Sequence, residues 1–227
     1  MSFKALGLAP YILRSIVKQE YKLPTPIQEQ AIPVILQGKD VLGIAPTGSG
    51  KTAAYALPII QNLEGKTTTK NRHINVLVLV PTRELAVQVE EVFRSFTHEL
   101  PFRLKSMAVH GGVSINPQMM GMQHLNVLVA TPGRLLELKE SNAMHFDSLS
   151  TLILDEADKM LNLGFKEEMD RIFALLPARR QNLLFSATLS PEVQAVERVL
   201  LKNPTVVHIE AKQLDLDLIN LVGYTVS

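Results

Sequence analysis

Residues 40–52 constrain the fold of this chain more than any other stretch. They read Asp-Val-Leu-Gly-Ile-Ala-Pro-Thr-Gly-Ser-Gly-Lys-Thr, an apolar run that breaks into glycines and ends on Lys51-Thr52. This order predicts a buried strand, a tight loop and a helix start whose free backbone N–H groups can hold phosphates. Lys51 would add a positive charge for the β- and γ-phosphates, and the Thr52 hydroxyl would ligate Mg²⁺. Ala45 stands where the strict pattern has its first glycine, so a glycine-rich turn with a chance lysine is the alternative.

Composition excludes several other classes of function. The 227 residues include no cysteine, so a disulfide framework and thiolate chemistry are excluded. Residues 1–19 are amphipathic and lack the apolar run of a signal peptide, and no stretch has the length needed to span a membrane. We therefore expect a cytoplasmic protein. Because the net charge is only +1, any contact with nucleic acid must depend on local groups.

Apolar strand-like runs alternate with helical patterns along most of the chain. Strands are predicted at residues 41–44, 76–80, 104–109, 127–130, 152–154, 183–185 and 206–209, and helices at 8–19, 25–38, 50–62, 83–98, 132–139, 166–176 and 191–201. Strands that are apolar throughout and separated by helices indicate a parallel sheet covered on both faces. We predict one α/β domain with a mostly parallel central sheet.

The residues that directly follow the strands carry the predicted chemistry, since ligands of such sheets gather beyond the carboxyl ends of the strands. Asp155 and Glu156 follow the apolar run at 152–154. This position would place Asp155 near Mg²⁺ and Glu156 near the water that attacks the γ-phosphate. A helix start that is rich in acids, to suit the helix dipole, is the alternative.

Three further strand ends have the features of phosphate-binding turns. Two look like capped helix starts with an arginine in the first turn, and the third is a glycine pair: Pro81-Thr82-Arg83, Thr131-Pro132-Gly133-Arg134 and Gly111-Gly112. Backbone N–H groups and arginines at such turns can hold a sugar–phosphate backbone without reading bases. Plain helix caps and turns are the alternative for each.

Ser186 and Thr188 follow the run at 183–185. Their hydroxyls are placed to hydrogen-bond Asp158, which would tie the nucleotide site to a movable neighbour. Simple capping by these hydroxyls is the alternative.

Together these motifs resemble, in identity, order and spacing, the first RecA-like domain of a DEAD-box ATP-dependent RNA helicase of superfamily 2. The resemblance is greatest to the bacterial RhlE-like branch and covers nearly the whole chain. Residues Asp155–Asp158 read Asp-Glu-Ala-Asp, the motif that names the family, whose phosphate loop also accepts an alanine at Ala45. The resemblance implies that ATP or ADP, with Mg²⁺, is bound by Ala45, Pro46, Thr47, Gly48, Ser49, Gly50, Lys51 and Thr52.

The resemblance also assigns the stretch 21–28, Tyr-Lys-Leu-Pro-Thr-Pro-Ile-Gln, to an adenine-reading Q motif that includes Thr25. It implies that Gln28 bonds the adenine edge, that Tyr21 contacts the ring and that Phe3 supports this site. Glu20 departs from the family, which usually has glycine there.

The remaining roles follow from the same resemblance. Lys51, Asp155 and Glu156 would be catalytic, and Thr52 and Asp155 would hold Mg²⁺, partly through water. Asp158, Ser186 and Thr188 would couple nucleotide state to movement. RNA would be contacted by Pro81, Thr82, Arg83, Gly111, Gly112, Thr131, Pro132, Gly133 and Arg134.

The function implied is ATP-dependent unwinding or remodelling of RNA through contacts that are independent of base sequence. We expect residues 1–38 to be N-terminal helices of the domain, 39–210 its RecA-like core, and 211–227 a connector toward a second RecA-like domain. This chain alone would be a monomer without membrane contact, and nearly inactive as an ATPase. An ATP-gated RNA clamp, a P-loop kinase and a helicase that acts on DNA are the alternatives.

Overall fold

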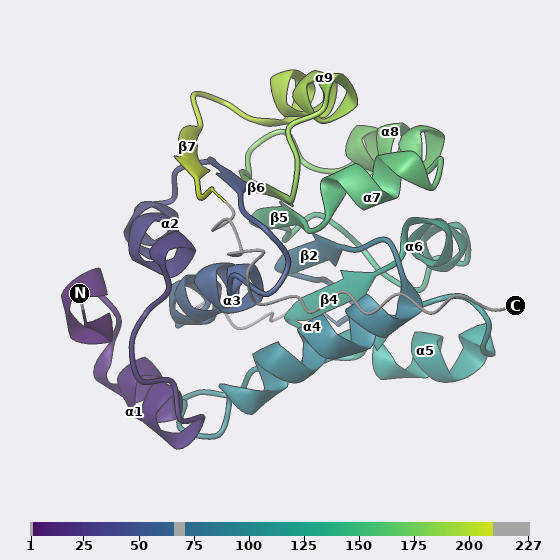
Figure 1. Ribbon diagram of the computed structural model, residues 1–227. Coiled ribbons are helices and arrows are strands. Elements are labelled where there is room, and N and C mark those ends of the chain that lie inside the picture. Colours follow the sequence, from purple (N-terminus) through teal and green to yellow (C-terminus); the bar gives the residue numbers. More distant parts are fainter. Residues whose placement is uncertain (1, 66–70, 211–227) are drawn as a thin grey trace, which may run out of the picture.

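The computed structural model describes residues 2–65 and 71–210, and within them the chain forms a sheet of seven parallel strands (Figure 1). The strand order is β3-β4-β2-β5-β6-β1-β7. The strands are β1 (Val41–Ile44), β2 (Val76–Leu79), β3 (Ser106–Val109), β4 (Val127–Ala130), β5 (Thr151–Leu154), β6 (Gln181–Ser186) and β7 (Thr205–His208). The pairing of these strands confirms the predicted α/β fold class with a parallel sheet.

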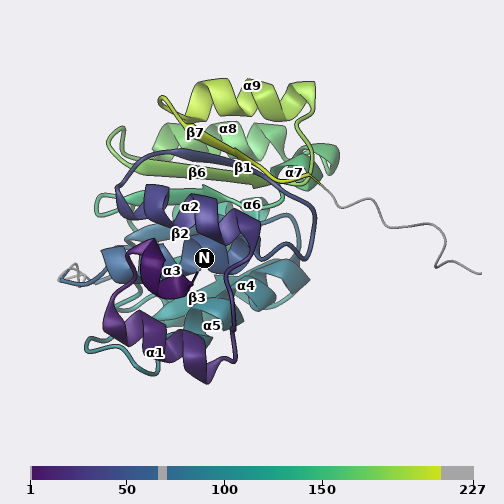
Figure 2. The same cartoon turned by 60° about the vertical axis from the view of Figure 1, so that its left-hand side comes forward.

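Helices cover both faces of the sheet (Figures 1 and 2). They are η1 (Phe3–Leu6), α1 (Pro10–Lys18), α2 (Pro26–Leu36), α3 (Lys51–Asn62), α4 (Arg83–Ser95), α5 (Ile115–Gly121), α6 (Pro132–Glu140), α7 (Ala157–Asn162), α8 (Lys166–Leu175) and α9 (Pro191–Leu200). In the described part of the chain, every helix is too short or too polar to cross a lipid bilayer.

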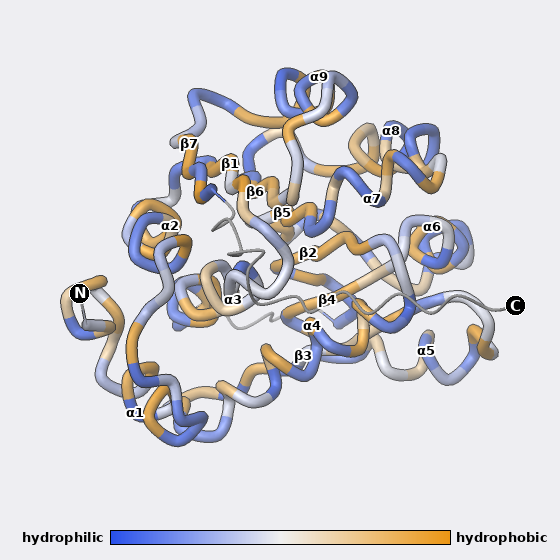
Figure 3. The backbone as a smooth tube through the Cα atoms, in the orientation of Figure 1, coloured by the Kyte–Doolittle hydropathy of each residue, from blue (hydrophilic) through white to orange (hydrophobic). Residues whose placement is uncertain are grey.

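Successive side chains of each strand enter two different cores, because a strand directs alternate residues to opposite faces of its sheet. Val76 and Val78 pack with helices η1 and α1–α4, whereas Leu77 and Leu79 pack with α5–α9. Figure 3 shows hydrophobic residues concentrated along the strands and on the helix sides that face them. Burial on both faces explains why the strands are apolar throughout and do not alternate with polar residues.

Besides the short 3₁₀ helix η1, two α-helices of the described residues were missed by the sequence prediction. Helix α5 has seven residues with Pro117 near its start, and α7 has six residues and begins inside the acidic motif at Ala157. Both are too short to show the 3.6-residue periodicity on which a helix prediction depends. The structure also starts the third strand at Ser106 instead of residue 104.

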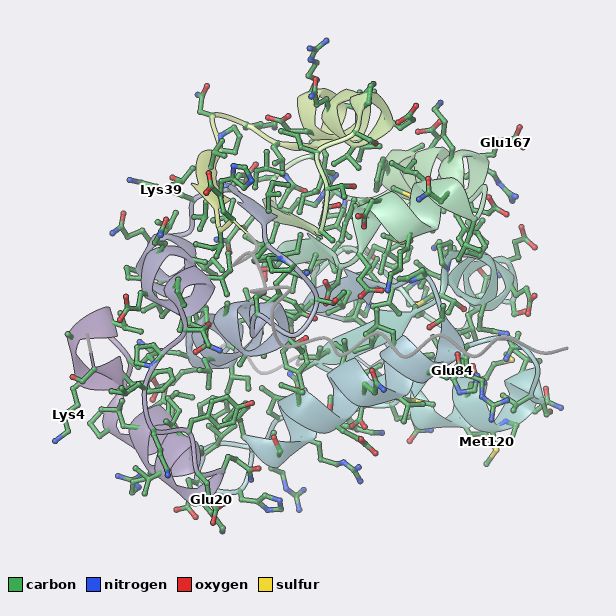
Figure 4. All side chains as sticks on the ribbon, in the orientation of Figure 1. Lys4, Glu20, Lys39, Glu84, Met120 and Glu167 are labelled. Atoms are coloured by element: carbon green, nitrogen blue, oxygen red, sulfur yellow. The ribbon has the colours of Figure 1, made fainter. Side chains whose placement is uncertain are left out.

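Glu20 adopts a left-handed backbone conformation with φ of 59°. Its N–H donates to the Val17 carbonyl at 3.0 Å and closes the end of α1, where Figure 4 shows the side chain projecting outward. Glycine reaches this conformation at little cost, which explains the residue that the family usually has here. The chain keeps the turn despite the substitution.

The N-terminal helices are joined to the core by hydrogen bonds. The Tyr11 hydroxyl donates to Glu64 at 2.7 Å, and the Ser15 hydroxyl donates to the Phe96 carbonyl at 3.1 Å. These contacts join α1 to the residues that follow α3 and α4. That residues 1–38 are part of the same domain stays a prediction. The predicted connector, 211–227, lies outside the described residues.

Asp40 ties together the amino ends of three strands. Its two carboxylate oxygens accept from the backbone N–H groups of Asn182 and Lys202, each at 2.8 Å, and its own carbonyl accepts from Thr205 at 2.9 Å. Asp40 is 7 % exposed, so water replaces these partners poorly. The side chain therefore links the start of β1 to β6 and to the segment that enters β7.

We predict that Asp40→Ala lowers the free energy of unfolding by about 3 kcal/mol, because two backbone N–H groups lose a charged acceptor. Urea unfolding followed by circular dichroism measures this change. The matched control is Asp147→Ala, whose side chain is 79 % exposed, with an expected change within about 0.5 kcal/mol. Equal losses in both variants would contradict the role assigned to Asp40.

Candidate nucleotide and nucleic-acid site

The sheet order divides its carboxyl edge into two halves. Because every strand is parallel, all of the segments that follow the strands reach the same edge. The phosphate loop, the acidic motif and Ser186–Thr188 follow β1, β5 and β6, which are neighbours in the order β5-β6-β1. The turns with backbone-binding features follow β3, β4 and β2, which are also neighbours. The two halves meet between β2 and β5.

The phosphate loop curls around the ammonium group of Lys51. Gly48 and Gly50 have positive φ angles of 78° and 91°, and α3 begins at the next residue. The Lys51 Nζ donates to the carbonyls of Ala45 at 2.7 Å and Pro46 at 3.2 Å. Burial lowers the pKa of Lys51, while the negative charge of Asp155 opposes that shift. The loop thus brings the Lys51 ammonium group close to the free backbone N–H groups at the start of α3, as phosphate binding requires.

Asp155 is fully enclosed at the end of β5. Its Oδ2 accepts from the Tyr55 hydroxyl at 2.8 Å, and its Oδ1 accepts from the Glu156 N–H at 3.0 Å. Burial raises the pKa of Asp155 to about 6, although the Tyr55 hydrogen bond and the charge of Lys51 act in the opposite direction. A buried carboxylate near an ammonium group, with a shifted pKa, is typical of a site that binds a charged ligand.

Asp155 and Thr52 suit a Mg²⁺ ion whose remaining ligands come from phosphates and water. In the described residues, no group of three or more His, Cys, Asp or Glu side chains has the arrangement of a protein-made metal site. Asp155 and the Thr52 hydroxyl offer hard oxygen ligands, and Mg²⁺ commonly takes one or two carboxylates together with phosphates and water. These residues match that pattern.

Glu156 has a left-handed backbone conformation, which is uncommon for residues other than glycine. Its φ is 54° and its ψ is 49°, which turns the chain from β5 directly into α7. The carboxylate lies 2.8 Å from the Lys159 Nζ, and the side chain is 16 % exposed. Strained backbone of this kind persists only where surrounding structure holds it, and it gathers at functional sites.

The contact predicted between Asp158 and Ser186–Thr188 is present. The Thr188 hydroxyl donates to the Asp158 carboxylate at 2.9 Å, and the Thr188 N–H donates to the same oxygen at 3.1 Å. The Ser186 hydroxyl oxygen accepts from the Asp158 N–H at 3.3 Å. The segments after β5 and β6 are therefore hydrogen-bonded to each other, while their coupling role stays a prediction.

The predicted Q motif lies against the phosphate loop. Gln28 is 1 % exposed; its amide nitrogen donates to the Gly50 carbonyl at 3.1 Å, and its oxygen accepts from the Thr25 N–H at 3.0 Å. The Tyr21 ring is 36 % exposed and stands edge-on to Phe3, with 6.5 Å between ring centroids. The Gln28 contact with Gly50 joins segments more than twenty residues apart, and no local pattern predicts it.

The three turns on the other half of the edge are also brought together. A Cβ atom on Gly112 would lie 4.0 Å from an Arg83 nitrogen, so the turns after β2 and β3 are neighbours. Arg83 is exposed at the start of α4, while the Thr82 hydroxyl caps that helix by accepting from the Leu85 N–H at 3.2 Å.

Arg134 is placed differently from the expected direct phosphate contact. Its side chain is 7 % exposed; Nε donates to Glu137 at 2.8 Å, and Nη2 donates to the Val113 carbonyl at 2.9 Å. The guanidinium group therefore holds the turn that contains Gly111-Gly112, instead of pointing outward. The difference arises because α6 packs Arg134 beneath that turn, an arrangement that the sequence does not specify.

Tyr55 is a site residue that the sequence interpretation missed. It lies one helical turn after Thr52 in an otherwise apolar stretch of α3, and its ring is fully buried. A single hydroxyl in such a stretch was the available signal, because buried hydroxyl groups require a partner. Only the fold identifies that partner as Asp155.

Comparison with known proteins agrees with this geometry. The DEAD/DEAH box helicase family model matches residues 25–196. The chain is 43 % identical over 221 residues to the ATP-dependent RNA helicase CshA of Limosilactobacillus reuteri, covering 97 % of this chain and 43 % of that protein. It is 43 % identical over 211 residues to the DEAD-box ATP-dependent RNA helicase RhpA of Helicobacter pylori, covering 92 % of this chain and 41 % of that protein.

A solved structure has the same fold. It is a DEAD box protein from the hyperthermophile Methanococcus jannaschii, with a TM-score of 0.85 and 33 % sequence identity, over 92 % of this chain and 56 % of that one. The chain spans less than half the length of the two curated relatives. Placement in the RhlE-like branch stays a prediction. The match of the family model to most of the chain, together with these relatives, shows that the chain belongs to the DEAD/DEAH box helicase family.

Proposed function

We propose that this chain is the first RecA-like, ATP-binding domain of an ATP-dependent RNA helicase, which hydrolyses ATP to unwind or remodel RNA. The observation that carries the proposal is the shared sheet edge. There β5, β6 and β1 bring the phosphate loop to Asp155–Asp158, and the adjacent strands β3, β4 and β2 present turns suited to a sugar–phosphate backbone. The names of the curated relatives support the same activity.

In this proposal the phosphate loop and Lys51 bind the triphosphate through backbone N–H groups and one positive charge. Thr52 and Asp155 hold Mg²⁺, partly through water; when bound, Mg²⁺ neutralises negative charge on the phosphates. Glu156 orients the attacking water and accepts its proton. The Glu156 carboxylate is already paired with Lys159 at 2.8 Å, so its direction is restrained before a ligand arrives.

Adenine recognition is assigned to Gln28 and Tyr21. The Gln28 amide uses one hydrogen for Gly50 and one lone pair for Thr25, and it retains a second of each. A donor and an acceptor side by side match the amino group and ring nitrogen of adenine. The partly exposed Tyr21 ring supplies an apolar contact, and Phe3 supports it.

RNA binding is assigned to the half of the carboxyl edge that is formed by β3, β4 and β2. Arg83 offers an exposed charge, and the turns at 81–83, 111–112 and 131–134 offer backbone N–H groups for phosphates. Because such contacts carry no base information, binding is independent of sequence, and the 2′-hydroxyl distinguishes RNA from DNA.

The partners proposed are RNA and a second RecA-like domain, which would close on this edge and complete the hydrolytic site. A cytoplasmic location and a monomeric state stay predictions of the sequence. Weak ATP hydrolysis by this chain alone also stays a prediction.

We predict that Lys51→Ala weakens ATP binding by roughly 100-fold, because a charge-assisted contact with phosphate is worth about 1.5–3 kcal/mol. Glu156→Gln should change ATP affinity by less than about threefold, yet lower phosphate release at least about 100-fold, since Glu156 acts on water. Fluorescent-nucleotide titration of this chain measures the first effect, and a phosphate-release assay with single-stranded RNA, on a protein that also contains the proposed second RecA-like domain, measures the second. Lys166→Ala, at the start of α8, is the control. Similar losses of affinity in both site variants would refute this division of roles.

We predict that Arg83→Ala weakens RNA binding equally for all base sequences and lowers the salt slope of log K by about one unit. Arg94→Ala, on the same helix and 63 % exposed, is the control and should have no such effect. Arg134→Ala should instead lower stability by about 1–3 kcal/mol, since it removes a buried donor from the Val113 carbonyl. RNA affinity over a salt series and urea unfolding separate these outcomes. Identical slopes for Arg83→Ala and Arg94→Ala would assign Arg83 to helix capping alone.

We predict that Asp155→Asn stabilises the ligand-free chain increasingly as the pH rises from about 4 to about 6. The pKa of Asp155 is raised from 3.8 to about 6 by burial, so in this window the folded chain holds a proton that the unfolded chain has lost. Stability of the unmodified chain therefore falls with rising pH, and the advantage of the asparagine grows by at most about 3 kcal/mol. Urea unfolding at pH 4, 5, 6 and 7 with a chelator present measures it. An advantage of Asp155→Asn that stays the same from pH 4 to pH 7 would contradict this prediction.

A further inference from the structure

Tyr55 places one hydroxyl inside an otherwise apolar layer. Its ring is fully buried against Phe93 and Phe185, with ring centroids 6.2 Å and 5.3 Å away. A phenylalanine would fill the same apolar space without the cost of burying a hydroxyl. The hydroxyl donates to Asp155 at 2.8 Å. This hydrogen bond satisfies the buried hydroxyl and explains why a tyrosine suits this position.

The contact fixes the orientation of the Asp155 carboxylate. Each oxygen receives a different donor: Oδ2 from Tyr55 on α3 and Oδ1 from the N–H of Glu156. One donor belongs to the end of β5, and the other belongs to the helix that begins at the phosphate loop. The Tyr55 hydrogen bond therefore sets the carboxylate relative to Lys51 and Thr52, although β6 lies between β5 and β1 in the sheet.

The Tyr55 ring is itself held in place by close packing. Phe185 of β6 lies beside Gly43 of β1, and a Cβ atom on Gly43 would come within 2.5 Å of the Phe185 ring. The glycine thus makes room for Phe185, and Phe185 supports Tyr55. Because the Tyr55 ring is packed on both sides, its hydroxyl group is held in one position, and the direction of its hydrogen bond to Asp155 is restricted.

We propose that Tyr55 is a positioning residue that orients Asp155 for the divalent cation of a bound magnesium–nucleotide complex. The inference rests on the proposed function. Tyr55 acts through Asp155 and does not contact the nucleotide. Its loss should therefore weaken the contribution of Mg²⁺ to nucleotide binding while leaving Mg²⁺-free binding intact.

The test is the Mg²⁺ dependence of ADP binding by the 227-residue chain, measured with a fluorescent ADP analogue in Mg²⁺ titrations and in chelator. Tyr55→Phe should raise the Mg²⁺ midpoint about tenfold, the scale typical of partners that support metal ligands. Affinity in chelator should change less than about twofold. In an Asp155→Asn background, Tyr55→Phe should have a much smaller effect, because its route through Asp155 has been removed and only its interaction with Thr52 remains.

The matched control is Tyr11→Phe. Tyr11 is also buried and also donates to a carboxylate, that of Glu64 at 2.7 Å, but Glu64 follows the C-terminal end of α3, whereas the phosphate loop precedes its N-terminal end. It should leave the Mg²⁺ midpoint unchanged. Phe185→Leu provides a second variant, since it keeps the Tyr55 hydroxyl and loosens only the support of its ring. It should shift the midpoint in the same direction by a smaller factor.

An unchanged Mg²⁺ midpoint in Tyr55→Phe would overturn the inference, as would an equal loss of affinity with and without Mg²⁺. A full effect that persists in the Asp155→Asn background would overturn it as well. An unmodified chain that binds no adenine nucleotide would instead refute the proposed function itself, and that outcome is visible before any variant is compared.

Discussion

Parallel pairing of the central strands is the constraint on which the rest of the structure depends. The strands are only four to six residues long, and the central ones are stable because they are paired on both sides in the sheet and buried on both faces. Parallel pairing sends every amino end to one edge and every carboxyl end to the other. The Asp40 network joins strands at the amino edge, while the motif residues gather at the carboxyl edge. Residues that hold the sheet together are thus separated in space from those that would bind ligands.

Buried charge distinguishes the nucleotide half of the carboxyl edge. Burial lowers the pKa of Lys51 and raises that of Asp155, so both groups are held in places that disfavour their charged forms. Their mutual attraction offsets part of this cost. A phosphate group near Lys51 and a cation near Asp155 would offset more, because each brings the opposite charge to a group that lacks water. The site therefore suits a ligand that carries both signs of charge, as the proposed magnesium–nucleotide complex does.

Two arginines on the other half of the edge lie in different environments. Arg83 is exposed at a helix start, whereas Arg134 is buried and holds the turn after β3 through the Val113 carbonyl. Two arginines in similar sequence settings therefore have different roles. Within the nucleotide half, the Asp158–Thr188 hydrogen bond joins the segments after β5 and β6. A movement of one segment would therefore be transmitted to the other.

The sequence by itself determined the fold class, the start of α3 at the phosphate loop and the position of Asp155 at a strand end. These depend on local signals, namely apolar runs, glycines and helix-start residues, which act within a few residues of each other. Only the tertiary structure decided which strands are neighbours, that Gln28 contacts Gly50, that Arg134 turns inward, and that Tyr55 meets Asp155. The physical reason is that periodicity specifies which side chains are buried but not which ones they face. Partners such as Tyr55 and Asp155, a hundred residues apart, are chosen by strand order and helix packing.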